Sequence, residues 1–187
     1  MTFLIEYCGW TNGQRVSLPH VRTLLHKATS EKRPKYERIE REIESRLEVW
    51  QGIGCIELES DPFYCEIEHL WPTKLDGNGV VQPELIDGLG LIDMRHAVLL
   101  YKVRCSLVHE FRGQVASGNL SNPSCYWPEN AEWRLIYSVT QIAELCKVGV
   151  VRLEERLRRD RESPMDSFSI GLFLNMRLNK PPQREVH

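Results

Sequence analysis

The sequence predicts a mainly α-helical protein, a bundle of four to five helices with a small β-hairpin or short strands inserted before the last long helix. Apolar side chains recur every three or four residues over 36–50 and 142–157, which indicates two amphipathic helices. The run 97–103 is apolar on nearly every side, as in a helix buried on several faces. We expect residues 1–187 to form a single domain with a disordered tail from 179 to 187.

The first helix is expected to begin at Ser17, with Pro19 in its first turn, because serine caps helices and proline fits their first turn. A stronger helix begins at Pro34. Its apolar stripe consists of Tyr36, Ile39, Ile43, Leu47 and Trp50. The other faces of 35–48 alternate acids and bases, which indicates a solvated surface, with an RNA-binding surface as the alternative.

Residues 55–90 are predicted to be irregular, because prolines and glycines interrupt every periodic pattern. A connection this long is unusual in a compact domain, and two explanations stay open, that it covers the site or that it contains a short helix. An acidic segment lies within them. It consists of Glu57, Glu59, Asp61, Glu66, Glu68 and His69. These residues have two interpretations, carboxylates on loops or short strands and ligands of a hard metal ion, and we favour the first.

A central helix is expected from Leu91 to Gly113, since glycine ends helices. Side chains alternate over 132–138, which together with 124–127 predicts the hairpin. The sequence from Ser138 to Gln141 predicts a capping box that starts the last long helix. Arginines near the end of that helix are interpreted as cations that complement its dipole. The alternative interpretation is that they contact RNA. They are Arg152, Arg156, Arg158, Arg159 and Arg161.

The composition is ordinary for a globular chain, with 42% hydrophobic and 27% charged residues and a net charge of −2. No apolar run approaches the roughly 20 residues that cross a bilayer, and the first residues lack the basic region of a signal peptide. We therefore expect a cytoplasmic protein without membrane contact, whose six cysteines are reduced. The cysteines lack the spacing of zinc ligands, and we expect no metal or other cofactor.

Two residues of the central helix carry chemistry, Arg104 and His109. Arg104 stands in the middle of an apolar stripe, so its charge must reach water, a partner or a pocket. At about 100° per residue, His109 lies about 140° further round the helix. The two side chains converge only if the helix ends loosely near Gly113 or if a second copy of the helix packs across a two-fold axis.

The stretch Tyr101-Lys-Val-Arg-Cys-Ser-Leu-Val-His-Glu-Phe111 resembles the signature of the HEPN superfamily, an arginine followed after four to six residues by a histidine near the end of a helix. The resemblance covers about two dozen residues and implies a HEPN-like helical domain. A second such pair, Arg15 and His20, is rejected, because Ser17 and Pro19 indicate that a helix begins there.

The chain departs from the family pattern at two positions. Cys105 follows the arginine where many members carry a polar residue, often asparagine, and this departure bears on the catalytic rate. Phe111 stands where some toxin members carry a tyrosine that an antitoxin modifies. Because Phe111 has no hydroxyl, we do not expect that form of control.

The resemblance implies a metal-independent endoribonuclease of the toxin or defence type, which acts on single-stranded RNA as a homodimer through this helix. The 2′-hydroxyl of RNA would attack the adjacent phosphate, with His109 as general base or acid and Arg104 binding the developing charge. Ser106 and Glu110 are supporting candidates, and an antitoxin or regulatory protein is a further partner. Two alternatives come from other classes, an inactive HEPN-like module that binds RNA or nucleotide and a helical scaffold for a partner protein.

Overall fold

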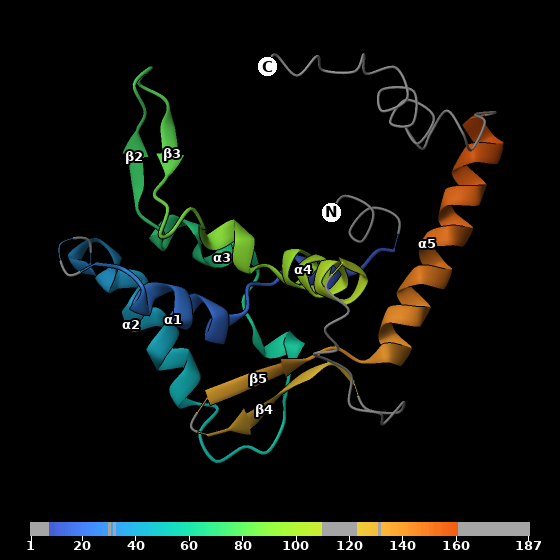
Figure 1. The fold of residues 1–187 in the computed structure, drawn as a ribbon, viewed down its shortest axis with the longest axis horizontal. Coiled ribbons are helices and arrows are strands. Elements are labelled where there is room, and N and C mark those ends of the chain that lie inside the picture. The colour runs from blue at the N-terminus through green and yellow to red at the C-terminus, as the bar shows by residue number, and fades with distance from the viewer. Residues whose placement is uncertain (1–7, 30, 32, 110–122, 131, 161–187) are drawn as a thin grey trace, which may run out of the picture.

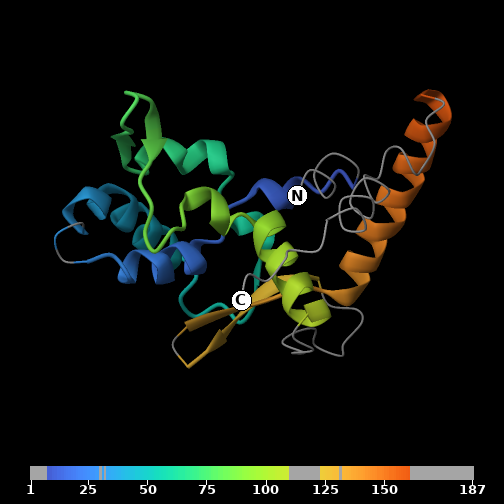
Figure 2. The same cartoon turned by 45° about the horizontal axis from the view of Figure 1, so that its top comes forward.

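The computed structural model describes residues 8–29, 31, 33–109, 123–130 and 132–160, and for residues 104–109 the backbone alone. Within these residues lie the helices α1 (Leu18–His26), α2 (Arg33–Glu48), α3 (Tyr64–Ile67), α4 (His96–His109) and α5 (Val139–Asp160). The strands are β1 (Ile56–Glu57), β2 (Thr73–Leu75), β3 (Val81–Pro83), β4 (Cys125–Glu129) and β5 (Glu132–Ile136). In Figures 1 and 2, α1 and α2 lie on one side of the molecule, α4 in the middle and α5 on the opposite side.

The predicted fold class, a mainly α HEPN-like helical bundle, is wrong, because the described residues form a mixed α and β structure. An antiparallel sheet of order β1-β4-β5 lies beside the helices, and β2 pairs with β3 in a second sheet. The strand β1 comes from the segment predicted to be irregular. It is two residues long, too short to show a period-2 pattern in the sequence.

The predicted hairpin before the last helix is confirmed. Tyr126 on β4 pairs with Leu135 on β5, and Ile56 on β1 pairs with Tyr126 from the other side. The ring of Trp50 packs on Tyr126 and on Trp133, with centroids 5.2 Å and 5.5 Å away. The sheet is therefore joined to the end of α2 by aromatic contacts.

The first two helices also agree with the sequence. Ser17 is the N-cap residue of α1, with proline in the first turn. The predicted stripe of α2 is buried at all five positions, including Trp50, which lies just beyond the helix. Helices α1 and α2 pack on each other, so their apolar faces form one half of the core.

The predicted central helix is shorter than expected. Leu91–Met94 form a 3₁₀ helix, Arg95 is extended, and α4 begins at His96. Arg95 pairs with Val16 in an antiparallel bridge, and the His96 amide donates to the carbonyl of Arg15. These tertiary bonds replace the helical bonds that the local sequence favours. The expected end of the helix, 110–113, lies outside the described residues.

Residues 55–90 contain more structure than predicted. They include α3, the strands β1 to β3 and two 3₁₀ helices, Leu58–Ser60 and Glu68–Leu70. The apolar side chains of Leu58, Ile67 and Trp71 are buried in the core. The β2–β3 hairpin projects from the body, as Figure 1 shows, and all its strand residues are exposed.

The last described helix, α5, begins as predicted. The amide of Gln141 donates to the Ser138 side chain at 3.4 Å, which caps the helix. Gly149 is the buried residue of α5, while Ile142 and Leu145 are partly buried against the core. None of the helices in the described part of the chain combines the length and apolar character needed to span a membrane.

Candidate functional site

The predicted site residues of the central helix lie near the end of α4. Arg104, Ser106 and His109 all stand on this helix, and the description of the chain stops at His109. Glu110 lies outside the described residues, as does Phe111. The described backbone therefore shows that the arginine and the histidine belong to one helix.

The two residues occupy different rows of the helix. Arg104 follows Ala97 and Leu100, which are 0% and 6% exposed, at spacings of seven and four residues. His109 instead follows the exposed Lys102 at a spacing of seven. By position, Arg104 continues the buried row and His109 continues the exposed row, so α4 alone does not bring them to one point.

A second cluster, missed by the sequence analysis, surrounds Asp61 in the core. Asp61 is 1% exposed, and its Oδ1 accepts the amide of Leu18 at 3.1 Å, which caps the first turn of α1. Its Oδ2 lies 2.8 Å from His96 Nε2 and also accepts the hydroxyl of Tyr126. These bonds satisfy a buried carboxylate with groups from α1, α4 and β4.

Tyr137 is the remaining member of this cluster and bonds to His96. Its hydroxyl lies 3.0 Å from His96 Nδ1 and donates to the His96 carbonyl at 3.3 Å. Burial and the charge of Asp61 raise the pKa of Tyr126 and of Tyr137 well above the usual value. Both phenols therefore stay protonated in the physiological range and act as hydrogen-bond groups.

The cluster extends from Asp61 toward the surface as a chain of side chains. Tyr126 Oη lies 2.8 Å from Ser17 Oγ, and Ser17 Oγ lies 2.7 Å from Nδ1 of His20. Ser17 is fully buried, whereas His20 is partly exposed. The chain Asp61–Tyr126–Ser17–His20 thus joins a buried carboxylate to an imidazole at the edge of the core.

The protons of this chain can be assigned from its buried end. A carboxylate only accepts hydrogen bonds, so the single proton of Tyr126 goes to Asp61, the nearest of its three partners, which also include Ser17 and His96. Ser17 then donates to the Tyr126 oxygen and accepts from Nδ1 of His20. This order holds His20 as the Nδ1–H tautomer and makes Nε2 its acceptor.

The surroundings of His20 keep its ring uncharged. Burial, the neighbouring His96 ring and the ammonium of Lys102 lower the pKa of His20 to about 4. Lys102 belongs to the exposed row of α4 that leads to His109. His20 belongs to the pair with Arg15 that the sequence analysis rejects.

Arg15 itself has a structural role. Its guanidinium stacks on Phe63 at 4.0 Å and donates to the side chain of Asn12 and to the carbonyl of Asp61. It precedes the helix that starts after Ser17, as the sequence predicts. Arg15 thus anchors the segment that bears Asp61 to the segment before α1.

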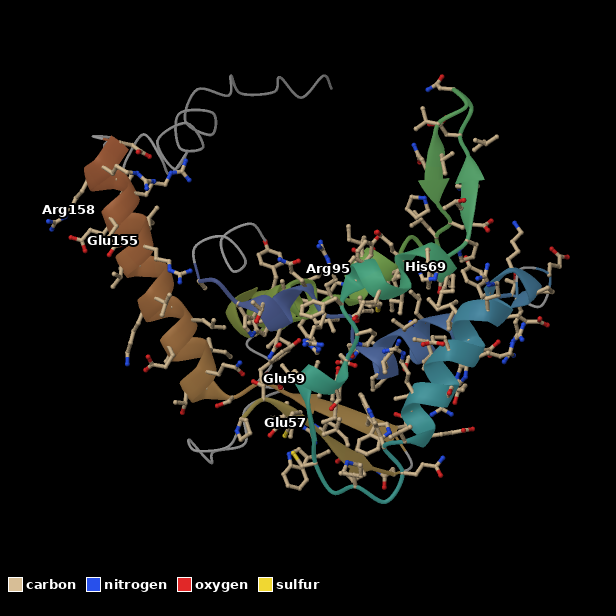
Figure 3. The ribbon with its side chains drawn as sticks, turned by 180° about the vertical axis from the view of Figure 1, so that it is seen from behind. Glu57, Glu59, His69, Arg95, Glu155 and Arg158 are labelled. Atoms are coloured by element: carbon tan, nitrogen blue, oxygen red, sulfur yellow. The ribbon has the colours of Figure 1, made fainter. Side chains whose placement is uncertain are left out.

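The acidic segment does not form one site. Figure 3 shows Glu57 and Glu59 well away from His69, and Asp61 is committed to the buried cluster. Among the described residues, no group of three or more histidine, cysteine or acidic side chains is arranged to hold a metal ion. Three of the described arginines near the end of α5 are paired with acids of the same helix, Arg158 with Glu154 and both Arg156 and Arg159 with Asp160, which supports the structural interpretation. Arg161 lies outside the described residues.

The five described cysteines are free thiols, as expected. They are Cys8, Cys55, Cys65, Cys125 and Cys146. Burial, with Cys55 as its neighbour, raises the pKa of Cys125 to about 12. A thiol held protonated in this way is a poor nucleophile.

Sequence reasoning missed the Asp61 cluster because its members lie far apart in the chain and follow no local pattern. In the sequence, Asp61 belongs to a segment of acids interpreted as loop or short-strand carboxylates, and Ser17 is interpreted as a helix cap. One signal was present, a histidine, His96, at the start of an apolar helix. Comparisons of this chain with protein family models, with curated proteins and with solved structures found no match.

Proposed function

We propose that the protein is a cytoplasmic endoribonuclease that cleaves single-stranded RNA without a metal ion, with Arg104 and His109 as its catalytic residues. The observation that supports this proposal is that Arg104 and His109 both stand on the helix α4, five positions apart. An arginine and a histidine at this spacing are also what the resemblance to the HEPN superfamily rests on. A toxin or defence role, with an antitoxin or regulatory partner, belongs to the same proposal.

The chemistry uses two different properties of these side chains. The 2′-oxygen of a ribose attacks the adjacent phosphorus, the bond from phosphorus to the 5′-oxygen breaks, and the products are a 2′,3′-cyclic phosphate and a 5′-hydroxyl. Arg104 binds the extra negative charge of the phosphorane with two parallel N–H donors. His109 exchanges a proton with the reacting oxygens.

The rows of α4 favour a homodimer. Arg104 continues the buried row and His109 the exposed row, so one copy of α4 directs the two positions to different sides. A two-fold axis along this helix would set Arg104 of one chain against His109 of the other. The proposal therefore places two composite sites in each dimer.

The test is cleavage of single-stranded RNA by the purified protein in EDTA. Arg104→Ala and His109→Ala should each lower the rate at least about 100-fold, because each removes a group that acts in the transition state. His26→Ala and Arg41→Ala, at exposed positions of α1 and α2, are matched controls and should keep the wild-type rate.

Circular dichroism and thermal unfolding establish that each variant is folded. Wild-type rates in either folded active-site variant would rule out the mechanism. Salt-dependent RNA binding without cleavage by the wild type would instead favour the binding-module alternative. A protein that neither binds nor cleaves RNA would favour the scaffold alternative.

A further inference from the structure

The outer side of α5 carries an exposed valine at its centre. Apolar residues that are partly or fully buried follow the inner side of the helix. They are Ile142, Leu145, Gly149, Leu153 and Leu157. Val151 stands about 200° round the helix from Gly149 and is 53% exposed, and Val148, three residues earlier, is 38% exposed. Valine is a weaker helix former than alanine or lysine, so helix stability does not account for these exposed valines.

Oppositely charged residues flank Val151 along the same side of α5. Before it, Lys147 pairs with Glu144 at 2.5 Å, and after it, Arg158 pairs with Glu154 at 2.6 Å. All four side chains are exposed, and they stand within about 60° of Val151 round the helix. Figure 3 shows Arg158 pointing away from the rest of the described chain. The outer face of α5 therefore presents an acid and a base on each side of an apolar centre.

A two-fold axis at Val151 would bring opposite charges of two copies together. In an antiparallel pair of helices, a residue before the axis lies level with the residue of the other copy that is equally far after it. Glu144 and Arg158 are each about 10 Å from Val151 along the helix. Lys147 and Glu154 are four residues before and three residues after Val151, so they too come nearly level.

This arrangement is complementary in one direction only. In the antiparallel pair, Lys147 of one copy meets Glu154 of the other, and Glu144 meets Arg158. The two ion pairs within the helices then join into a ring of alternating charge on each half of the contact. A parallel pair of helices would place each charge level with its own kind, which is unfavourable.

We propose that this outer face of α5 binds the same face of a second copy of the chain, in an antiparallel contact with a two-fold axis at Val151. The valines at 148 and 151 form its apolar centre, and the four charged residues fix its direction. The inference does not rest on the proposed ribonuclease function. The contact is also distinct from the one proposed through α4, because it uses a different helix.

The size of the contact sets its strength. From Glu144 to Arg158 it follows one helix for about 21 Å and is about 10 Å wide, the width of a helix. Standard interfaces bury about 800 Å² per partner, which is more than a strip of this size supplies. We therefore expect reversible association that increases with protein concentration and weakens as salt screens the charges.

The first test compares two valines that are neighbours in the sequence. Val151→Asp places two carboxylates against each other on the axis, so it should halve the mass of the assembly at concentrations where the wild type associates. Val150 is more exposed, at 61%, but lies about 100° away round the helix. Val150→Asp is therefore the matched control and should leave the mass unchanged. Sedimentation velocity over a concentration series measures the mass, and circular dichroism establishes that each variant is folded.

The second test exchanges charges across the contact. Lys147→Glu and Glu154→Lys each set like charges against each other in both halves, and each should weaken association at least about 10-fold. The double variant with both changes should associate again, because each exchanged pair is opposite once more. Arg41→Glu, at an exposed position of α2, changes the net charge by the same amount as Lys147→Glu and should have no effect.

Three results would overturn the contact. One is a wild type that stays monomeric at every concentration and salt. Another is an assembly on which Val151→Asp and Val150→Asp act equally, since the copies would then meet through another surface. The third is a folded double variant that associates no better than the single variants. The mass of the assembly is measured without RNA, so these results leave the proposed function to its own test.

Discussion

At the scale of single residues, Asp61 is the group on which the core depends. It is fully buried, yet both of its oxygens are used, by the backbone of Leu18 and by the side chains of His96 and Tyr126. A carboxylate taken out of water is tolerated only with such partners. The same residue also sets the proton order that reaches His20.

Replacing Asp61 should therefore destabilise the protein strongly. We expect Asp61→Ala to lower the free energy of unfolding by about 3 to 5 kcal/mol, because it leaves His96 and Tyr126 buried without their acceptor. Urea unfolding measures this loss. Glu57→Gln, an exposed acid four residues earlier, should change stability by less than about 0.5 kcal/mol. A similarly small change for Asp61→Ala would show that the cluster makes no net contribution to the free energy of unfolding.

His20 should make stability depend on pH. As pH falls below 6.5 the unfolded chain binds a proton at His20 that the folded chain, with a pKa of about 4, does not yet bind. The unfolded state then holds more protons, so stability falls with pH through this window. Between pH 7 and 4.5 the wild type should lose about 2 to 3 kcal/mol more than His20→Asn. Urea titrations at both pH values test this, and equal losses would contradict it.

At the scale of elements, periodic segments were predictable and short ones were not. The stripe of α2 and the alternation of β5 each repeat over several residues, so burial of one face leaves a readable pattern. The two residues of β1 and the break at Arg95 depend on partners elsewhere in the chain, Tyr126 and Val16. No local signal records such a partner, and the fold class was missed for that reason.

The second half of α5 should be the least protected of the long helices. From Val150 to Asp160 its side chains are exposed or partly buried, whereas α2 buries four residues. Local opening needs little free energy where few apolar side chains leave water. Hydrogen exchange followed by mass spectrometry should therefore show faster exchange in 150–160 than in 36–47. Equal protection of the two segments would mean that another surface covers α5.

At the scale of the whole molecule, the two rows of α4 make a prediction about assembly. If Arg104 of one chain meets His109 of the other, a mixture of the two inactive variants, Arg104→Ala and His109→Ala, should regain activity. Random exchange of chains makes half of the dimers mixed, and each mixed dimer has one intact site out of two. About a quarter of the wild-type rate should therefore return. If both residues act within one chain, mixing should restore nothing.

The candidate site was predictable only in part. Arg104 and His109 stand within six residues of each other, and a short motif can display such a pair. Ser17, Asp61 and Tyr126 meet only after the chain folds, and His20 joins them through its bond to Ser17. A hydrogen-bond chain of this kind is a property of the tertiary structure, which a motif cannot display.

The spread of the Asp61 cluster along the chain also governs how the protein is made. A ribosome that adds about 5 to 20 residues per second needs about 2 to 8 seconds to go from His96 to Tyr137. At the start of this interval the nascent chain already holds Asp61 and His96, and the two phenols that close the cluster are added only later, Tyr126 first and Tyr137 last. Helices α1 and α2 can dock early, but the half-made core stays open to water and to chaperones until the hairpin emerges.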